Sequence, residues 1–96
     1  MTKAEIVSEI AERTGIEKVA VQQTVESFMS VVKGSLIKGE AVYLRGFGSF
    51  IIKHRAAKTG RDISKGKAIH IPEHNIPAFK PAKTLMVHVK DKVKVK

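Results

Sequence analysis

The chain has no cysteine and no tryptophan, and only five of its 96 residues are aromatic. Without cysteine, neither disulfide bonds nor thiolate metal sites can stabilise the fold, which fits a reducing compartment. No stretch approaches the roughly 18 apolar residues that a membrane span requires, and the first residues lack the apolar run of a signal peptide. We therefore expect a soluble, cytoplasmic protein that makes no contact with a membrane.

The residues that are present are sufficient for one small core. Hydrophobic residues make up 43% of the chain. Because few of them are aromatic, the core must consist mainly of Ile, Val, Leu and Ala. Ninety-six residues predict a single domain near the lower end of what one core can stabilise. A small basic domain without disulfides often gains additional core by dimerising.

Positive charge is unevenly distributed along the chain. Residues 1–50 contain six basic and six acidic side chains, which cancel. Residues 51–96 contain twelve basic and three acidic side chains, and these account for the entire net charge of +9. A neutral half followed by a basic half predicts a folded body that presents a cationic element to a polyanion.

Two helices are predicted in the neutral half. Thr2 and Glu5 have the spacing of a capping box, in which each side chain hydrogen-bonds a free backbone N–H. Gly15 suits the left-handed position that ends a helix. A longer helix is predicted over about 18–38, where apolar side chains recur every three or four residues. Its apolar surface is wide for a helix on a small body, so one side is expected to face a partner chain.

After Gly39 the hydrophobic period changes from about 3.6 to about 2, which predicts strands. Strands are expected over 41–45 and 49–52, joined by a tight turn at 46–48. Residues 53–72 alternate in the same way but are too polar for a core. We therefore predict a β-hairpin arm that extends away from the body.

The remaining segments complete the predicted architecture. The arm contains a turn-rich segment at 59–66, and a short strand at 76–80 returns to the body. A brief helix near 82–90 follows, and residues 91–96 are predicted to be a disordered basic tail. The fold class is α+β: a helical hairpin, a three-stranded antiparallel sheet with a protruding ribbon arm, and a short C-terminal helix.

No combination of residues in the chain indicates catalysis. His70 and His74 have a spacing that could bind a metal on a helix, but Pro72 between them argues against a helix. His54 and His70 could face each other across the arm, yet no carboxylate or cysteine completes a ligand set. A phosphate-binding glycine loop is also missing. We predict no enzyme activity, no metal, no cofactor and no small-molecule substrate.

The basic residues between positions 53 and 83 form the candidate binding site. On a two-stranded ribbon, such charges can follow the phosphates of a duplex. The arm contains no Asn or Gln between residues 53 and 74, which favours binding without sequence readout. Only Asp62 and Glu73 oppose eight basic residues: Lys53, Arg55, Lys58, Arg61, Lys65, Lys67, Lys80 and Lys83.

Several motifs together resemble one known family. They are Gly46-Phe47-Gly48-Ser49-Phe50, Arg55-Ala56-Ala57-Lys58-Thr59-Gly60-Arg61, Ile71-Pro72 and Pro77-Ala78-Phe79-Lys80-Pro81. Combined, they are similar to the bacterial histone-like HU and integration host factor family, over essentially residues 1–90. The resemblance implies one DNA-binding domain over 1–90, with its arm at about 53–75.

The resemblance also implies how the protein would bind double-stranded DNA. Two chains, as a homodimer or a heterodimer, would intertwine around a shared core containing Phe47, Phe50 and Phe79. Both arms would lie in the minor groove, a mode known for this family. Lys80 and Lys83 would contact DNA from the body, as would Lys3. The expected function is to bend, wrap and compact DNA in the nucleoid.

The chain departs from the family pattern at the arm tip. Most relatives have Arg-Asn-Pro, whose proline wedges between base pairs, whereas this chain has Arg61-Asp62-Ile63. Isoleucine is among the side chains that can intercalate, so we expect Ile63 to be the wedge. It lacks the fixed φ of proline, so a less sharply defined kink is expected.

Two other functions are weighed against this one. A sequence-selective protein like integration host factor would prefer particular duplexes, which a comparison of random duplexes tests. A structural RNA-binding protein would usually have aromatic side chains for stacking on single strands, and the arm has none.

Overall fold

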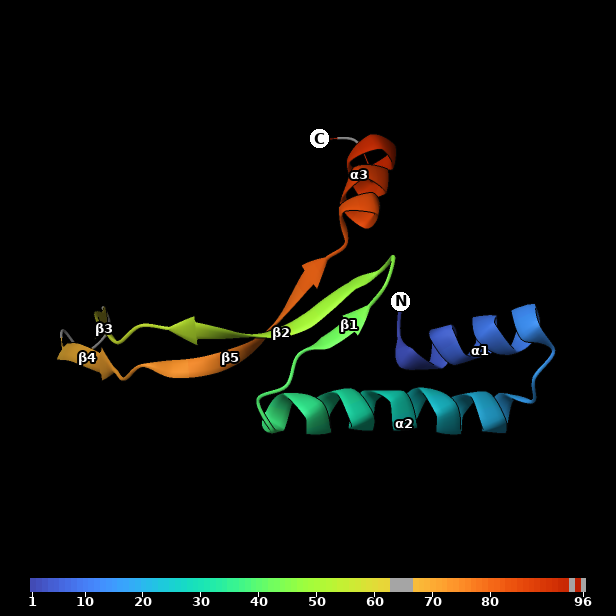
Figure 1. Ribbon diagram of the computed structural model, residues 1–96, viewed down its shortest axis with the longest axis horizontal. Helices are drawn as coiled ribbons and strands as arrows, with labels where there is room; N and C mark the ends of the chain where they lie inside the picture. Colours follow the sequence, from blue (N-terminus) through green and yellow to red (C-terminus); the bar gives the residue numbers. More distant parts are fainter. Residues whose placement is uncertain (63–66, 94, 96) are drawn as a thin grey trace.

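The computed structural model describes residues 1–62, 67–93 and 95, with only the backbone of 61, 62, 67 and 68. A helical hairpin, a three-stranded sheet, a projecting arm and a third helix follow one another (Figure 1). The predicted α+β fold is therefore confirmed. The arm extends from one end of the sheet, and the third helix projects from the other (Figure 1).

The hairpin consists of α1 (Lys3–Thr14) and α2 (Lys18–Ile37), as predicted. The Glu5 N–H donates to the Thr2 hydroxyl oxygen at 3.2 Å, which satisfies one free donor at the start of α1. The Thr2 hydroxyl in turn donates to the Glu5 carboxylate at 3.2 Å. Only one of the two hydrogen bonds of the expected capping box is thus formed. The Glu5 carboxylate accepts from the Thr2 hydroxyl instead of from a backbone N–H. Gly15 ends α1 with a φ of 75°, as predicted.

The body sheet has the strand order β1-β2-β5 and is antiparallel throughout. Its strands are β1 (Val42–Leu44), β2 (Gly48–Arg55) and β5 (His74–Pro81). Phe50 pairs with Val42 on one side and with Phe79 on the other. Because side chains alternate along a strand, these three residues share one face, on the side where α2 contacts β1 and β2.

An aromatic cluster connects the strands at the centre of this sheet. The Phe79 ring centroid lies 5.3 Å from that of Phe47 and 5.1 Å from that of Phe50, which is within the range of favourable aromatic pairs. Gly48 lies directly beneath the cluster. A Cβ atom there would stand 2.6 Å from Phe79 Cζ and 2.7 Å from the Lys80 carbonyl oxygen. Glycine at this position is therefore a steric requirement of the packing.

The arm consists of two separate ladders. The first is the outer part of β2 and β5, and it ends where Arg55 pairs with His74. The second pairs β3 (Lys58–Asp62) with β4 (Lys67–Ile71). Residues 59–62 were expected in a turn but belong to β3, because pairing with β4 satisfies their backbone groups despite Gly60 and Asp62.

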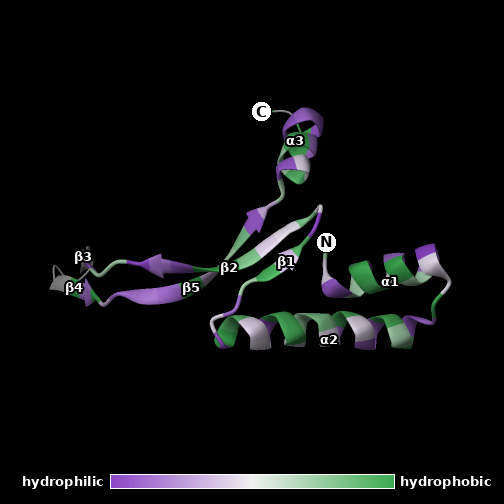
Figure 2. Cartoon of the chain, in the orientation of Figure 1, coloured by the Kyte–Doolittle hydropathy of each residue, from purple (hydrophilic) through white to green (hydrophobic). Residues whose placement is uncertain are grey.

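The third helix, α3 (Lys83–Lys92), is longer than predicted. It continues two residues beyond position 90, so the predicted disordered tail does not begin at 91. Lys90 and Lys92 lie in the last turn, where positive charge interacts favourably with the helix dipole. No residue of α3 is buried, and its exposed hydrophobic side chains include Met86 and Val89. Figure 2 shows hydrophobic and hydrophilic residues along α3.

Candidate nucleic-acid interface

The outer face of the body sheet collects three of the predicted basic residues. Lys53 and Arg55 are two apart in β2, so their side chains lie on the same face. Lys80 in β5 pairs with Ser49, which places it on that face as well. This is the face opposite the Phe50 side chain and α2. Alternation in two neighbouring strands therefore produces a row of positive charge from the body towards the arm.

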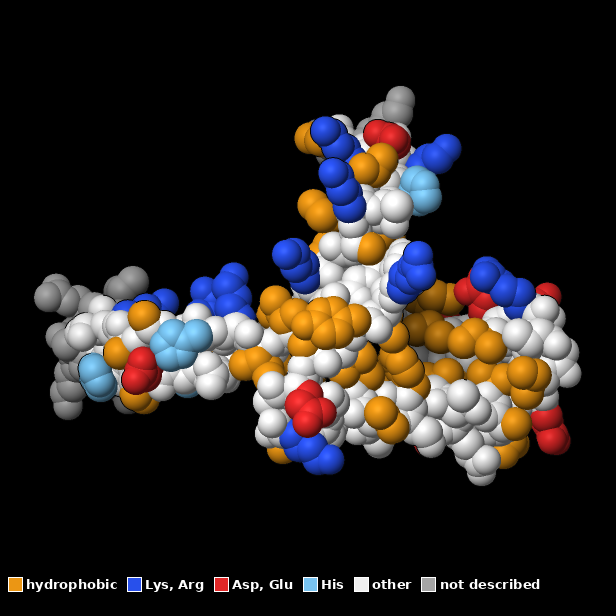
Figure 3. All heavy atoms as spheres, viewed as in Figure 1, with side chains coloured by type: hydrophobic (Ala, Val, Ile, Leu, Met, Phe, Trp, Pro, Cys, Tyr) orange, Lys and Arg blue, Asp and Glu red, His pale blue; other side chains and the backbone are white. Residues whose placement is uncertain are grey.

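A hollow with both polar and apolar lining residues continues this row beside the start of α3. It is lined by Arg45, Lys80 and Lys83, together with Tyr43 and Ser49. Figure 3 shows Lys and Arg side chains on both sides of the base of α3 and along one edge of the arm. Lys80 and Lys83 thus line the same hollow.

Arg45 is a candidate residue that the sequence patterns did not single out. It follows β1 directly and precedes the Gly46 turn, so it looked like part of a strand end in a neutral segment. The signal that could have found it is its position next to the turn. Gly46, with a φ of 82°, reverses the chain there and brings Arg45 to the hollow that contains Lys80.

Three further predicted residues lie in the distal arm. Lys58 begins β3 and pairs with Ile71. The backbone of Arg61 lies in β3 and that of Lys67 in β4. Ile63 and Lys65 lie outside the described residues, so the structure does not place the predicted wedge.

Lys3 is separate from the other candidates. Its Nζ atom donates to the Glu26 carboxylate at 2.9 Å, which joins α1 to α2. The hydrogen bond from Lys3 and its positive charge, with a further hydrogen bond from Gln22, lower the pKa of Glu26 below its ordinary value of 4.5. Glu26 is therefore ionised at neutral pH and partly compensates the charge of Lys3.

A second set of polar contacts lies where the two arm ladders meet. His54 Nε2 is 3.2 Å from Glu73 Oε2, and His54 Nδ1 is 3.2 Å from Asn75 Oδ1. The neighbouring His74 contacts the Pro72 carbonyl oxygen through Nδ1 at 2.9 Å. Within the described parts of the chain, no group of three or more His, Cys, Asp or Glu residues could hold a metal ion. No described helix is long and apolar enough to cross a membrane.

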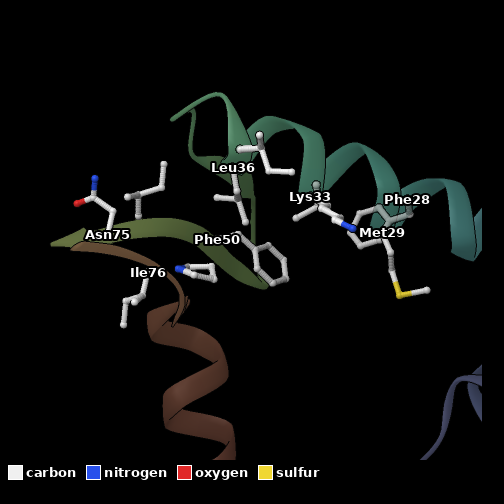
Figure 4. Close-up of a pocket in the computed structure, with 11 residues that line it drawn as sticks. Phe28, Met29, Lys33, Leu36, Phe50, Asn75 and Ile76 are labelled. Atoms are coloured by element: carbon white, nitrogen blue, oxygen red, sulfur yellow. The ribbon is translucent and has the colours of Figure 1, made fainter. Parts of the chain in front are cut away.

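The inner face of the sheet presents an open apolar surface. A hollow of about 580 Å³ runs between α2 and the sheet (Figure 4). Its lining includes Phe28, Met29, Leu36, Phe50 and Pro77. Figure 3 shows hydrophobic side chains gathered over the body, in contrast to the charged arm. The chain therefore has one apolar surface and one basic surface, on different sides of its sheet.

Comparisons with known proteins agree with this arrangement. The family model for bacterial DNA-binding proteins matches residues 1–90. The chain is 41% identical to the SPbeta prophage-derived DNA-binding protein HU 2 of Bacillus subtilis over the full length of both. It is also 41% identical to the integration host factor subunit beta of Marinobacter nauticus, covering 98% of this chain and 97% of the relative. A cocrystal structure of Anabaena HU with DNA superposes with a TM-score of 0.88 at 29% identity, covering 94% of this chain and 98% of the other.

Proposed function

Because this chain belongs to the bacterial DNA-binding protein family that includes HU and integration host factor, we propose that it is a histone-like architectural protein. It binds duplex DNA largely without sequence specificity, and it bends, wraps and compacts the DNA. The observation that carries this proposal is that Lys53, Arg55 and Lys80 share one face of the sheet, from the body to the base of the arm. The similar Anabaena protein was crystallised with DNA.

The proposed binding mode combines the family's mechanism with the charges of this chain. Minor-groove binding by β-arms is a known property of HU and integration host factor, and we infer it here from family membership. Lys53, Arg55, Lys58, Arg61, Lys65 and Lys67 would contact DNA from the arm, and Lys80 and Lys83 from the body. Lys3 would contact flanking phosphates, in exchange for its bond to Glu26. Bending lets more of this surface contact phosphates, which compensates for the cost of deforming the duplex.

Two copies of the chain would form the binding unit. The radius of gyration is 18.7 Å, whereas a compact domain of this length would have about 12–13 Å. Buried hydrophobic side chains among the described residues are Val7, Val21 and Val32, while the apolar hollow beside α2 stays open. A second copy that covers this hollow would complete the core around Phe50. It would also place two arms on one DNA molecule.

The dimer is tested by charge substitution on α2. Met29 lines the hollow and has an exposed fraction of 46%, whereas Val31 is 70% exposed and does not line it. We expect Met29→Asp to produce monomers or unfolded chains in sedimentation velocity, because an unpaired carboxylate would be buried. Val31→Asp is the matched control and should remain dimeric. A dimeric Met29→Asp protein would contradict this interface.

Salt dependence tests the electrostatic part of the proposal. Each phosphate that is neutralised should contribute about −0.9 to the slope of log affinity against log salt concentration. We expect affinity for random-sequence duplexes to fall steeply between about 50 and 200 mM salt. A nearly flat dependence would rule out binding through the basic surface. Equal affinity for duplex RNA at one salt concentration would favour a ribonucleoprotein role.

Ile63, which follows β3 in the chain, is proposed as the residue that wedges between base pairs. The support is its position in the sequence, where relatives of this family have proline, and its apolar character. Energy transfer between the two ends of a short duplex would report the bend. Ile63→Ala should change affinity modestly and reduce bending. Unchanged bending would show that another residue forms the kink.

A sequence-selective role is the second candidate, because identity to an integration host factor subunit equals that to HU 2. Competition between random duplexes separates the two, since a selective protein would prefer some of them clearly. The proposed location is the cytoplasmic nucleoid, where the DNA is. We propose a binding role rather than an enzymatic one, because the candidate surface offers cations and no catalytic arrangement.

A further inference from the structure

The junction between the two arm ladders contains an interaction that the binding mode above does not use. The first ladder ends at Arg55 and His74, and the second begins at Lys58 and Ile71. Two residues on each strand, 56–57 and 72–73, lie between the ladders and belong to neither. Backbone pairing is therefore interrupted at one level of the arm, and side chains are available to bridge it.

His54 provides such a bridge. It belongs to β2, and its ring contacts Glu73 in the junction and Asn75 in β5. In the observed arrangement both ring nitrogens face oxygen atoms, at 3.2 Å each. A neutral imidazole has one N–H and can donate to only one of them, whereas an imidazolium donates to both. A neutral ring keeps both contacts only if the Asn75 amide turns its NH₂ group towards Nδ1.

The charges around His54 favour this interpretation. Lys53 and Arg55 flank it in β2, but their side chains lie on the opposite face. His74 follows Glu73 and bonds to the Pro72 carbonyl. On the face that carries His54, the packed helix is α2, and its Lys33 lines the same hollow as Asn75. Glu73 is thus the acidic side chain in direct contact with His54.

Resting on the DNA-binding function proposed above, we propose that His54 and Glu73 are positioning residues that form a proton-sensitive clasp across the arm junction. Glu73 is one of two acidic residues in an otherwise basic arm, so its charge repels DNA phosphates. A protonated His54 neutralises that charge and holds the junction through two donors. Histidine is the side chain that changes charge between about pH 5 and 8. The clasp therefore predicts a DNA affinity that increases as the pH falls.

The test is DNA affinity at pH 6 and pH 8 at constant ionic strength, with a random duplex as the probe. One linked proton changes an association constant by at most about tenfold per pH unit. The wild-type protein should bind several-fold more tightly at pH 6. His54→Gln should lose at least half of that ratio. Glu73→Gln should bind more tightly than wild type at pH 8 and also show a smaller ratio. Both side chains are more than half exposed, so the fold does not depend on them.

His88→Gln is the matched control, because it removes a histidine from α3 instead of the arm. It should keep the wild-type ratio. The double variant His54→Gln/Glu73→Gln should show the same reduced pH ratio as the single variants, since both remove the same interaction. An unchanged ratio in His54→Gln, an equal loss in His88→Gln, or weaker binding of Glu73→Gln at pH 8 would each overturn the clasp. If the wild-type protein binds DNA at neither pH, the proposed function itself fails.

Discussion

The body and the arm of this chain are both built on antiparallel strands, but different interactions stabilise them. In the body, side chains pack across elements: Phe79 contacts Phe47 and Phe50, and Val7 and Val21 are buried between helices. In the arm, Lys58–Asp62 pairs with β4 through the backbone, although few side chains pack there. The comparison shows that an arm held by backbone pairing leaves its side chains free to carry charge.

The two regions also differ in how their charges are compensated. In the hairpin, acidic and basic side chains pair locally, as Arg13 does with Glu9 at 3.0 Å and Lys3 with Glu26 at 2.9 Å. In the arm, basic residues on both strands repel one another, with only Asp62 and Glu73 to oppose them. Such repulsion is tolerable in a thin ribbon surrounded by water and salt, which screen it over about 10 Å. A polyanion would remove it entirely.

The largest expected difference between the two regions is in the stability lost when a glycine is replaced by alanine. Gly48→Ala places a Cβ within 2.6 Å of Phe79, so the core must shift, at an expected cost of about 1–3 kcal/mol in unfolding free energy. Gly60→Ala in the arm meets nothing within 4 Å, and its φ is not positive, so its effect should stay within about 0.5 kcal/mol. Urea unfolding of both variants measures this. Equal losses would show that the arm is packed as tightly as the body.

Charge removal from the arm should affect binding without affecting stability. We expect Arg55→Gln/Lys58→Gln to weaken DNA binding about tenfold at moderate salt and to reduce the salt slope by about 1.8, for two lost phosphate contacts. The melting temperature should stay close to that of the wild type. Lys38→Gln, at the end of α2 on the other side of the sheet, is the control and should preserve affinity. A similar loss in the control would indicate a general charge effect instead of a defined surface.

The smallest effect is expected at the Lys3–Glu26 pair. The pKa of Glu26 is lowered by Lys3, so this contact stabilises the fold above pH 4.5 and is lost as the pH falls through the lowered value. Glu26→Gln should remove this part of the acid dependence while leaving the rest. Melting temperatures between pH 2 and pH 7 would detect it. If both proteins lose stability equally on acidification, the pair contributes nothing measurable, as is common for exposed ion pairs.

Local patterns predicted the elements well, because their signals involve neighbouring residues. The glycine-ended first helix, the turn at Gly46 and the returning strand at Phe50 are all recognisable from spacing. The predictions were less accurate at the boundaries of elements. Residues 59–62 have turn-like composition but form β3, and the helix expected to end at 90 reaches Lys92. In both places, favourable backbone hydrogen bonds outweighed weak local preferences.

The candidate surface was predictable as a set of charges but not as an arrangement. The excess of basic residues after position 50 is a property of the sequence alone, and it indicates a polyanionic partner. Arg45 belongs to the neutral half, yet the turn at Gly46 places it beside Lys80 and Lys83. His54 and Glu73 are nineteen positions apart, and only the pairing of β2 with β5 brings them within 3.2 Å.

The sequence by itself determined the kind of partner, the number of elements and the family, since charge, periodicity and motif spacing are local properties. Tertiary structure decided which of those residues meet. Strand register aligned Lys53 and Arg55 with Lys80 on one face and left the opposite face apolar, because alternation fixes faces only after the strands have paired. It also divided the arm at residues 56–57 and 72–73, where the ladder is interrupted and side chains from distant positions complete the connection.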